Sequence, residues 1–180
     1  PVLKLSTVKN SDESRTLIAV FNYKDKETKE SFSIKGAKIN FYIGVDSIVK
    51  IGTVETNENG IAKCDIKSDF IFPKNEEGFI HFGADFEGND LIGSASNELD
   101  VKDLIIELTL EEIDSVKTVT VKVAQLNGKN ERMPLNEVEM PVCVARMFSH
   151  LKLGTIALTD GEGTFEFPSD LPGDTAGNIV

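Results

Sequence analysis

The chain has 180 residues and a net charge of −11, with 19 Lys and Arg against 30 Asp and Glu. An acidic surface repels phosphate backbones and anionic headgroups, which argues against nucleic acids and membrane surfaces as partners. No apolar run approaches the length of a membrane span, so direct membrane insertion is not expected. With 40% hydrophobic and 27% charged residues, the composition is typical of a folded, well-solvated protein.

Along the chain, short segments alternate apolar and polar residues, which is the period of a strand with one buried face. The predicted inward residues, in chain order, are Leu17, Ala19, Phe21, Ile39, Phe41, Phe82, Phe86, Val119, Val121 and Val123. Residues 104–110 form another apolar strand segment. Because turn signals separate these segments and no helical stripe is present, an all-β antiparallel sandwich is predicted.

The sequence also repeats itself weakly. The stretch "VLKLSTVKNSDESRTLIAVFNY" from Val2 aligns without a gap on "LIIELTLEEIDSVKTVTVKVAQ" from Leu104, an offset of 102. A pattern that keeps its register over such a distance is evidence for tandem units. We therefore expect two sandwich domains, residues 1–112 and 113–180, with residues 111–117 as a short junction.

Two similar hairpins mark the same repeat, "GTVETNENG" at residues 52–60 and "GTIALTDGEG" at residues 154–163. Gly52 aligns with Gly154, whereas Thr56 aligns with Thr159 at an offset of 103, which predicts one inserted residue in the second copy. We expect Gly60 and Gly163 to close the two loops.

The hairpin loops also carry side-chain oxygens, on Asn57, Asn59 and Asp160. A calcium loop is one interpretation of these residues. Neither loop has the full set of spaced carboxylates, which favours a plain turn.

The stretch "GFIHFGADFEGNDLIGSASNELDV", residues 78–101, resembles the closing hairpin of bacterial immunoglobulin-like, or prealbumin-like, repeats of exported proteins. The resemblance implies two tandem immunoglobulin-like β-sandwiches, the second incomplete at its C-terminal end. It also implies a location outside the cytoplasm, in the periplasm or at the cell surface, on a parent chain anchored to the membrane or attached to the surface. These repeats share no active site, so the resemblance supplies no catalytic residues.

An acidic loop follows the third inward segment. Asp85, Glu87, Asn89 and Asp90 place oxygens at nearly alternate positions, a set that could hold Ca²⁺ between domains and stiffen an array. The alternative is a solvated acidic turn, because the seventh-ligand pattern of a calcium loop is missing.

All three methionines, Met133, Met140 and Met147, fall in one short stretch that also contains Cys143 and His150. Sulfur and imidazole ligands suit Cu(I). In a strand, however, Met140 points away from Cys143, and core packing is the favoured interpretation. Cys64 and Cys143 are not equivalent in the repeat, so both are expected to be free, buried thiols.

The sequence contains no recognisable catalytic constellation. Neither histidine has a metalloenzyme spacing, and no nucleophile elbow or phosphate-binding glycine loop is present. We expect a non-enzymatic spacer or protein-binding module without a cofactor, its protein partner not identified by the sequence. A carbohydrate- or cation-binding module is the alternative, weakened by the absence of Trp and by only two Tyr.

Overall fold

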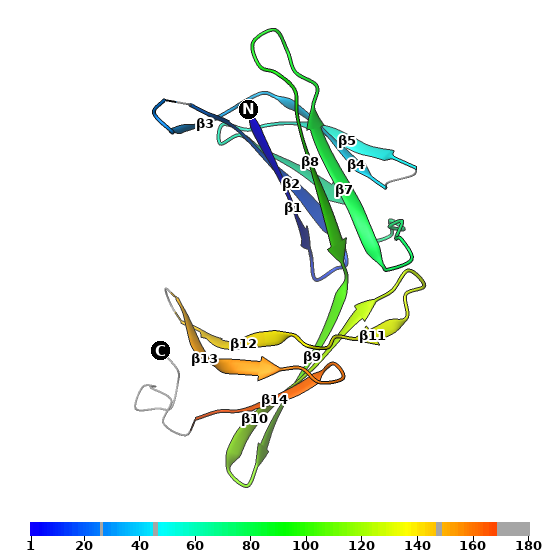
Figure 1. The fold of residues 1–180 in the computed structure, drawn as a ribbon, viewed down its shortest axis with the longest axis vertical. Helices are drawn as coiled ribbons and strands as arrows, with labels where there is room; N and C mark the ends of the chain where they lie inside the picture. Colours follow the sequence, from blue (N-terminus) through cyan, green and yellow to red (C-terminus); the bar gives the residue numbers. More distant parts are fainter. Residues whose placement is uncertain (26, 45–46, 147–148, 169–180) are drawn as a thin grey trace. The chain divides into compact units, whose positions relative to one another are not determined.

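The computed structural model describes residues 1–25, 27–44, 47–146 and 149–168, and in this part the chain is all-β, with antiparallel sheets and no helix (Figure 1). The chain divides into two compact units, Pro1–Val101 and Lys102–Val180. These are called unit 1 and unit 2 below, and each is described by itself. The predicted all-β antiparallel class is confirmed, and the sheets are consistent with a β-sandwich.

Unit 1 consists of two four-stranded sheets. In the first sheet, β2 lies centrally between β1 and β6 and also pairs with β3; the second sheet has the order β5-β4-β7-β8. The strand bounds are β1 (Val2–Lys9), β2 (Arg15–Lys24), β3 (Ser31–Ser33), β4 (Lys38–Ile43), β5 (Val49–Glu55), β6 (Ile61–Ile66), β7 (Phe79–Phe86) and β8 (Ala95–Lys102).

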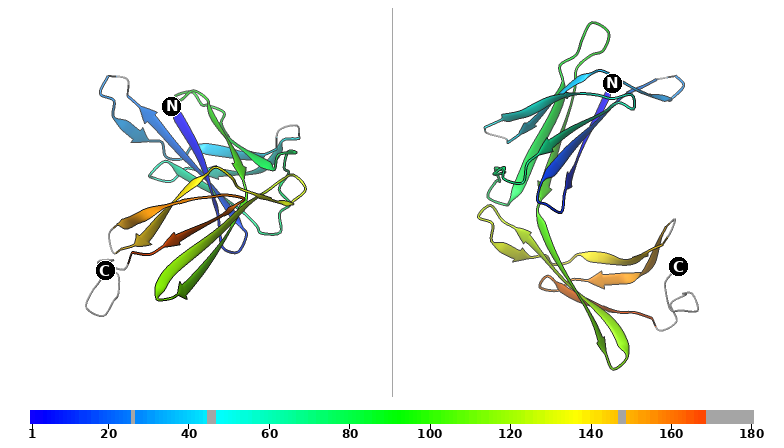
Figure 2. Two further views of the ribbon diagram at one scale, coloured as in Figure 1. Left: turned by 60° about the horizontal axis from the view of Figure 1, so that its bottom comes forward. Right: turned by 180° about the vertical axis from the view of Figure 1, so that it is seen from behind.

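The core of unit 1 lies between these sheets, which face each other in the two further views (Figure 2). On β2, β4 and β7 alternate residues are fully enclosed, as the period-2 pattern predicted. The largest fully buried side chains are Phe21, Phe41, Phe82, Leu17, Ile39, Ile43 and Ile80. Two of them belong to β7, so this strand supplies a large part of the core.

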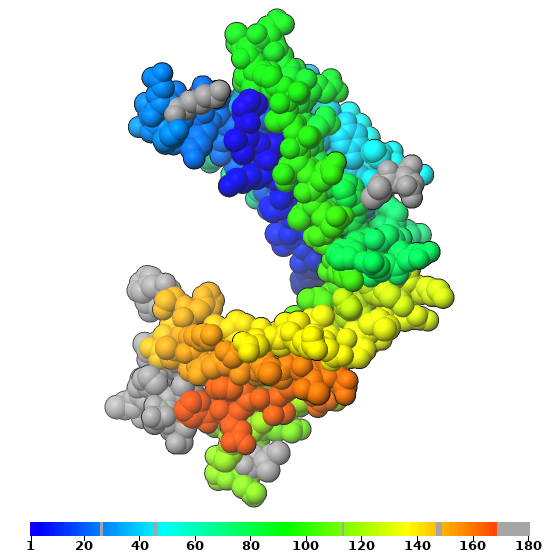
Figure 3. Space-filling view, viewed as in Figure 1, coloured from blue at the N-terminus to red at the C-terminus, as the bar shows by residue number. Residues whose placement is uncertain are grey.

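The β7–β8 hairpin also joins the two sheets of unit 1 at the side where β1 lies. The backbone amide of Leu5 on β1 donates to the side-chain oxygen of Asn97 on β8 at 3.0 Å. The green hairpin lies beside the blue β1 in the space-filling view (Figure 3). Leu3 and Leu5 are consequently buried, at 4% and 9% exposure.

Unit 2 has six strands in its described residues. Strand β10 pairs with β9, β11 and β14, and β12 pairs with β13 in a separate two-stranded sheet. The strand bounds are β9 (Leu104–Ile113), β10 (Val116–Leu126), β11 (Arg132–Pro134), β12 (Glu139–Ala145), β13 (His150–Ala157) and β14 (Glu162–Glu166).

The strand pairings of unit 2 match those of β1 to β6 in unit 1. Strand β10 has three partners as β2 has, and β12 pairs with β13 as β4 pairs with β5. Each of the latter pairs has a bulge at the same place, after Phe41 on β4 and after Val142 on β12. The extra residue of the bulge also matches, because Ile51 on β5 and Leu153 on β13 have no partner, and the adjacent Gly52 and Gly154 stand opposite Phe41 and Val142.

The hairpin equivalence expected from the sequence was wrong. Gly60 accepts a hydrogen bond from Phe21 N, and Gly161 accepts the corresponding bond from Val123 N. Both glycines have a positive φ, at 70° and 74°. Gly163 instead lies inside β14, opposite Val121. The loop between β13 and β14 spans residues 158–161 against 56–60 in unit 1, so it is one residue shorter rather than longer.

The division between the units also differs from the expected boundary after residue 112. Strand β9 pairs with β10 along its length and therefore belongs to unit 2 as its first strand. Residues 111–117, expected to be a junction, contain the tight turn of this hairpin, where Asp114 and Ser115 have positive φ. The expected loss of closing strands concerns residues from Asn178 onward, which lie outside the described residues.

Candidate functional site

The acidic residues expected to bind calcium start at the end of β7. Asp85 is half-buried on the outer face of the β5-β4-β7-β8 sheet, and Glu87 follows in the loop. The side-chain amide of Asn40 on β4 donates to Asp85 Oδ2 at 3.2 Å and to Glu87 Oε1 at 3.3 Å. Asn40 is 5% exposed and accepts from Thr53 Oγ1 at 2.8 Å. Both carboxylates therefore bind the buried Asn40 amide, and their oxygens do not converge on a common cation position.

Tyr42 lies beside Asn40 on β4. Burial, then the hydrogen bond to Asp85 and the negative charges of Asp85 and Glu87, raises the pKa of the Tyr42 hydroxyl. The neutral Tyr42 hydroxyl is a donor to the Asp85 carboxylate. Together with Asn40 and Glu87, these residues form a polar strip on the outer face of the sheet. On the neighbouring part of β7, His81 Nδ1 lies 2.8 Å from Asp100 Oδ1 on β8.

The other two expected ligands do not join this strip. The side-chain oxygen of Asn89 accepts from Leu91 N at 3.0 Å and from Ile92 N at 2.8 Å, which forms the loop's own turn. Asp90 is exposed. Within the described residues no group of three or more His, Cys, Asp and Glu side chains is placed to hold a metal ion. The structure thus brings Asp85 and Glu87 together and leaves Asn89 and Asp90 apart from them.

The other hairpin loops with candidate oxygens form tight turns, and in the first of them Asn57 bonds to its own turn. Asn57 Oδ1 accepts from Asn59 N at 2.9 Å and from Ile61 N at 3.0 Å. Asp160 lies in the left-handed region at φ 49°, next to Gly161. Two consecutive residues with positive φ are the signature of a tight hairpin turn.

The sulfur-rich stretch is divided between two faces of β12. Met140 is half-buried and packs against the core of unit 2, whereas Cys143 is exposed. His150 is exposed at the start of β13, and Met147 lies outside the described residues. Both cysteines are free, as expected, and Cys64 is buried, but the expected burial of Cys143 was wrong. The reason is strand alternation, because Cys143 follows the inward-facing Val142.

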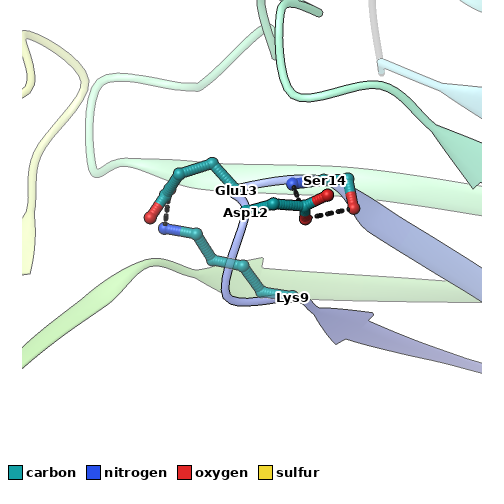
Figure 4. A network of polar contacts seen from close by, with 4 residues as sticks. All are labelled: Lys9, Asp12, Glu13 and Ser14. Carbon is teal, nitrogen blue, oxygen red and sulfur yellow. Dashed lines mark hydrogen bonds and ion pairs between the residues drawn. The ribbon is translucent and has the colours of Figure 1, made fainter.

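A polar network orders the β1–β2 turn of unit 1 (Figure 4). Ser14 donates to Asp12 Oδ1 from its hydroxyl at 2.6 Å and from its backbone amide at 3.0 Å. These bonds lower the pKa of Asp12, the side-chain bond contributing most. Lys9 pairs with Glu13 at 2.6 Å across the same turn. The network contains turn-forming residues, and its side chains are mostly exposed, as is usual for a structural turn.

Two features were missed by sequence reasoning. Thr56 is buried, and its hydroxyl accepts from Ala37 N at 2.9 Å and donates to Ile34 O at 2.6 Å. Its counterpart in unit 2 is Leu158, not Thr159, since Leu158 N donates to Val138 O as Thr56 N donates to Ala37 O. Because Leu158 has no hydroxyl, the repeat gives no sequence signal for the two hydrogen bonds of the Thr56 hydroxyl.

The second feature is a pair of exposed aromatic rings. Tyr23 on β2 and Phe32 on β3 stand directly opposite each other and are 46% and 53% exposed. The alternation of β2 places Tyr23 on the core-facing side of the strand, beyond the part that the core covers.

Comparison with known proteins finds no family model, no curated protein and no solved structure that matches this chain. Among the residues that the structure describes, no helix is long and apolar enough to cross a membrane.

Proposed function

We propose that this chain is a non-enzymatic structural or interaction module, made of tandem immunoglobulin-like β-sandwich units, in an exported bacterial protein. The observation that carries the proposal is the recurrence of six strands, their pairings and one bulge in both units. Repeated units of one kind in a row are the usual architecture of spacers and of extended binding surfaces. The likeness of residues 78–101 to bacterial immunoglobulin-like repeats supports the same class and its location outside the cytoplasm.

A structural role predicts resistance to load, which force spectroscopy on the whole chain can measure. We expect unit 1 to unfold in one step that releases roughly 330–360 Å of contour length from the 101 residues of Pro1–Val101. Smooth extension without a force peak would contradict a load-bearing spacer.

Calcium binding at the acidic loop is a separate prediction, and we expect it to be absent. Asp85 and Glu87 already accept bonds from Asn40, and Asn89 is committed to its turn, so the oxygens needed for six to eight ligands do not converge. Scanning calorimetry of the chain in calcium and in chelator should give the same transition temperatures. A transition that rises with calcium and returns to its chelator value in Asp85→Asn would overturn this and favour a calcium-stiffened array.

Glycan binding is the second candidate function, favoured by Tyr23 and Phe32. Sugar-binding surfaces use exposed aromatic faces, and this pair stands on one side of the β2–β3 pair. A glycan array should then show binding that Tyr23→Ser and Phe32→Ser each abolish. The matching positions in unit 2, Gln125 and Met133, offer no second aromatic platform.

A further inference from the structure

The two units differ most in what covers their inner faces. In unit 1, β4 pairs with β5 on one side and with β7 on the other. In unit 2, the described residues give β12 one partner, β13. The edge of β12 that corresponds to the β7 side of β4 is therefore open in the described part of the chain.

The inner side chains of β12 are less covered than those of β4. Ile39, Phe41 and Ile43 are completely buried. Their counterparts, set by the shared bulge, are Met140, Val142 and Val144, and all three are only half-buried.

A second apolar strip lies on β9. Leu104, Ile106, Leu108 and Leu110 stand opposite Gln125, Val123, Val121 and Val119. Residues directly opposite in an antiparallel pair point to the same face, so the strip faces the side on which the core of unit 2 lies. Nevertheless these four side chains are 46%, 50%, 66% and 73% exposed.

In unit 1, the equivalent apolar residues of β1 are covered. Leu3 and Leu5 on β1 are the counterparts of Ile106 and Leu108, because they stand opposite Phe21 and Ala19. Both are buried in the same core cluster as Ile80 and Phe82 of β7. Asn97 of β8 also bonds to Leu5 N. The β7–β8 hairpin therefore covers both β4 and β1 in unit 1.

We infer that the open face of unit 2, formed by the inner residues of β9 and β12, accepts an added β-hairpin with the pattern of β7–β8. The added strand would run antiparallel to β12 and carry an apolar residue at every second position. Main-chain hydrogen bonds to the edge of β12 would provide affinity. The apolar side chains of β9 and β12 would provide specificity for a strand whose every second residue is apolar. This inference rests on the proposed equivalence of the two units and makes unit 2 a strand-accepting interaction surface.

Pro141 limits the register of the added strand. It occupies the position of Asn40, the residue at which the β4–β7 pairing ends. A proline lacks a donor and is tolerated at a strand edge, where it discourages unselective pairing. Strand addition that follows the unit 1 register loses a donor only at the end of the ladder and keeps Val142, Cys143 and Val144 for pairing.

A register-specific disulfide can test the inference. In unit 1 a Cβ built on Gly83 would lie 3.8 Å from the Cβ of Tyr42. That separation is close to the mean of about 3.8 Å between Cβ atoms in disulfides. Cys143 is the counterpart of Tyr42 and is exposed. A cysteine at position 83 of an added hairpin would consequently meet Cys143.

The probe is a synthetic peptide of residues 78–102 carrying Gly83→Cys, mixed with the whole chain in a glutathione redox buffer. The matched control peptide carries Ala84→Cys, whose side chain points to the opposite face of the strand. The chain carries Cys64→Ala, so that Cys143 is its only thiol. We expect cross-linking to be about tenfold faster or more with the Gly83→Cys peptide, because binding raises the local thiol concentration.

Two further variants keep the test specific. Adding Cys143→Ser to the chain should abolish the cross-link, and replacing Ile80 and Phe82 by Ser in the peptide should reduce it to the level of the Ala84→Cys control. Hydrogen exchange of β9 and β12 should slow when the unmodified peptide is added.

Equal cross-linking by both cysteine peptides, or none, would overturn the inference. A Cys143–Cys143 dimer that forms instead of the peptide adduct would also overturn it and identify a second copy as the occupant. These failures leave the force response of the chain unaffected, so they are distinguishable from failure of the proposed structural role.

Discussion

At the scale of single residues, the backbone of Gly60 illustrates why hairpin loops constrain the sequence. Its φ is 70°, and an added Cβ would lie 2.5 Å from Phe21 O. Left-handed backbone costs an L-residue about 1–2 kcal/mol, and the contact with a carbonyl adds to this. We expect Gly60→Ala to lower the free energy of unfolding by more than ~2 kcal/mol in urea denaturation.

Gly36 provides the matched control for this prediction. Its φ is 74°, but nothing lies within 4 Å of an added Cβ. Gly36→Ala should thus show the backbone cost alone, about 1–2 kcal/mol. Equal losses in the two variants would mean that the contact with Phe21 relaxes without cost.

Asp12 makes a pH-dependent prediction at the same scale. Its pKa in the folded chain is lowered from the ordinary value of 3.8. The Asp12 contribution to stability is therefore fully present above 3.8 and is lost as the pH falls below that value through the lowered folded pKa. Asp12→Asn, which does not titrate, should flatten the acid limb of a plot of urea midpoint against pH.

The comparison that tests this is the difference between the wild-type and Asp12→Asn curves. Asp25 also has a lowered pKa, caused by the Thr28 and Glu27 amides, and titrates equally in both proteins. An unchanged acid limb in Asp12→Asn would show that the Ser14 bonds do not contribute to acid sensitivity.

At the scale of elements, Thr56 holds the β5–β6 hairpin to the segment before β4. Thr56→Val keeps the shape but leaves Ala37 N and Ile34 O without their bonds to the hydroxyl. Unsatisfied buried groups cost about 1–3 kcal/mol each, so a loss of roughly 2 kcal/mol or more is expected in urea denaturation. Thr56→Ser retains the hydroxyl and should cost less; a Thr56→Val protein as stable as wild type would contradict this role.

Strand identity was predictable from the sequence, but the exact equivalence of the two units was not. Alternation identified the buried faces of β2, β4, β7 and β10 correctly, because burial imposes a period of two. Aligning identical residues misplaced Thr159 and Gly163, because the β13–β14 loop that carries Gly161 is one residue shorter than the β5–β6 loop. Turn residues recur in any tight loop, whereas cross-strand hydrogen bonds decide which positions are equivalent.

The candidate site shows the same limit. Asp85, Glu87, Asn89 and Asp90 are close in sequence, which suggested a shared cation. Spacing along a loop does not reveal that Asn89 bonds to its own turn or that Asn40, from another strand, holds two of the carboxylates. The exposed strip on β9 was likewise invisible, since its leucines resemble core residues until their covering strand is considered.

At the scale of the whole molecule, the two units have unequal cores. That of unit 1 includes the buried residues of β7, whereas that of unit 2 is formed around Val119, Val121 and Val123 with the β9 strip exposed. Since buried apolar area is the main source of folding stability, unit 2 should be the weaker unit. In hydrogen exchange of the whole chain, β10 amides should exchange faster than β2 amides.

Variants in each core test whether this difference arises from the two cores separately. Phe82→Ala removes a completely buried ring and should cost unit 1 about 3–5 kcal/mol, seen as faster exchange in β2 and β4. Val121→Ala removes two buried methyl groups and should cost unit 2 about 1.5–2 kcal/mol, seen in β10 and β14. If Phe82→Ala accelerated β10 as much as β2, the units would unfold together and exchange could not rank their separate stabilities. If β10 were instead better protected than β2 in the wild type, the exposed β9 strip would not weaken unit 2, and the inference that this face accepts an added hairpin would lose its energetic basis.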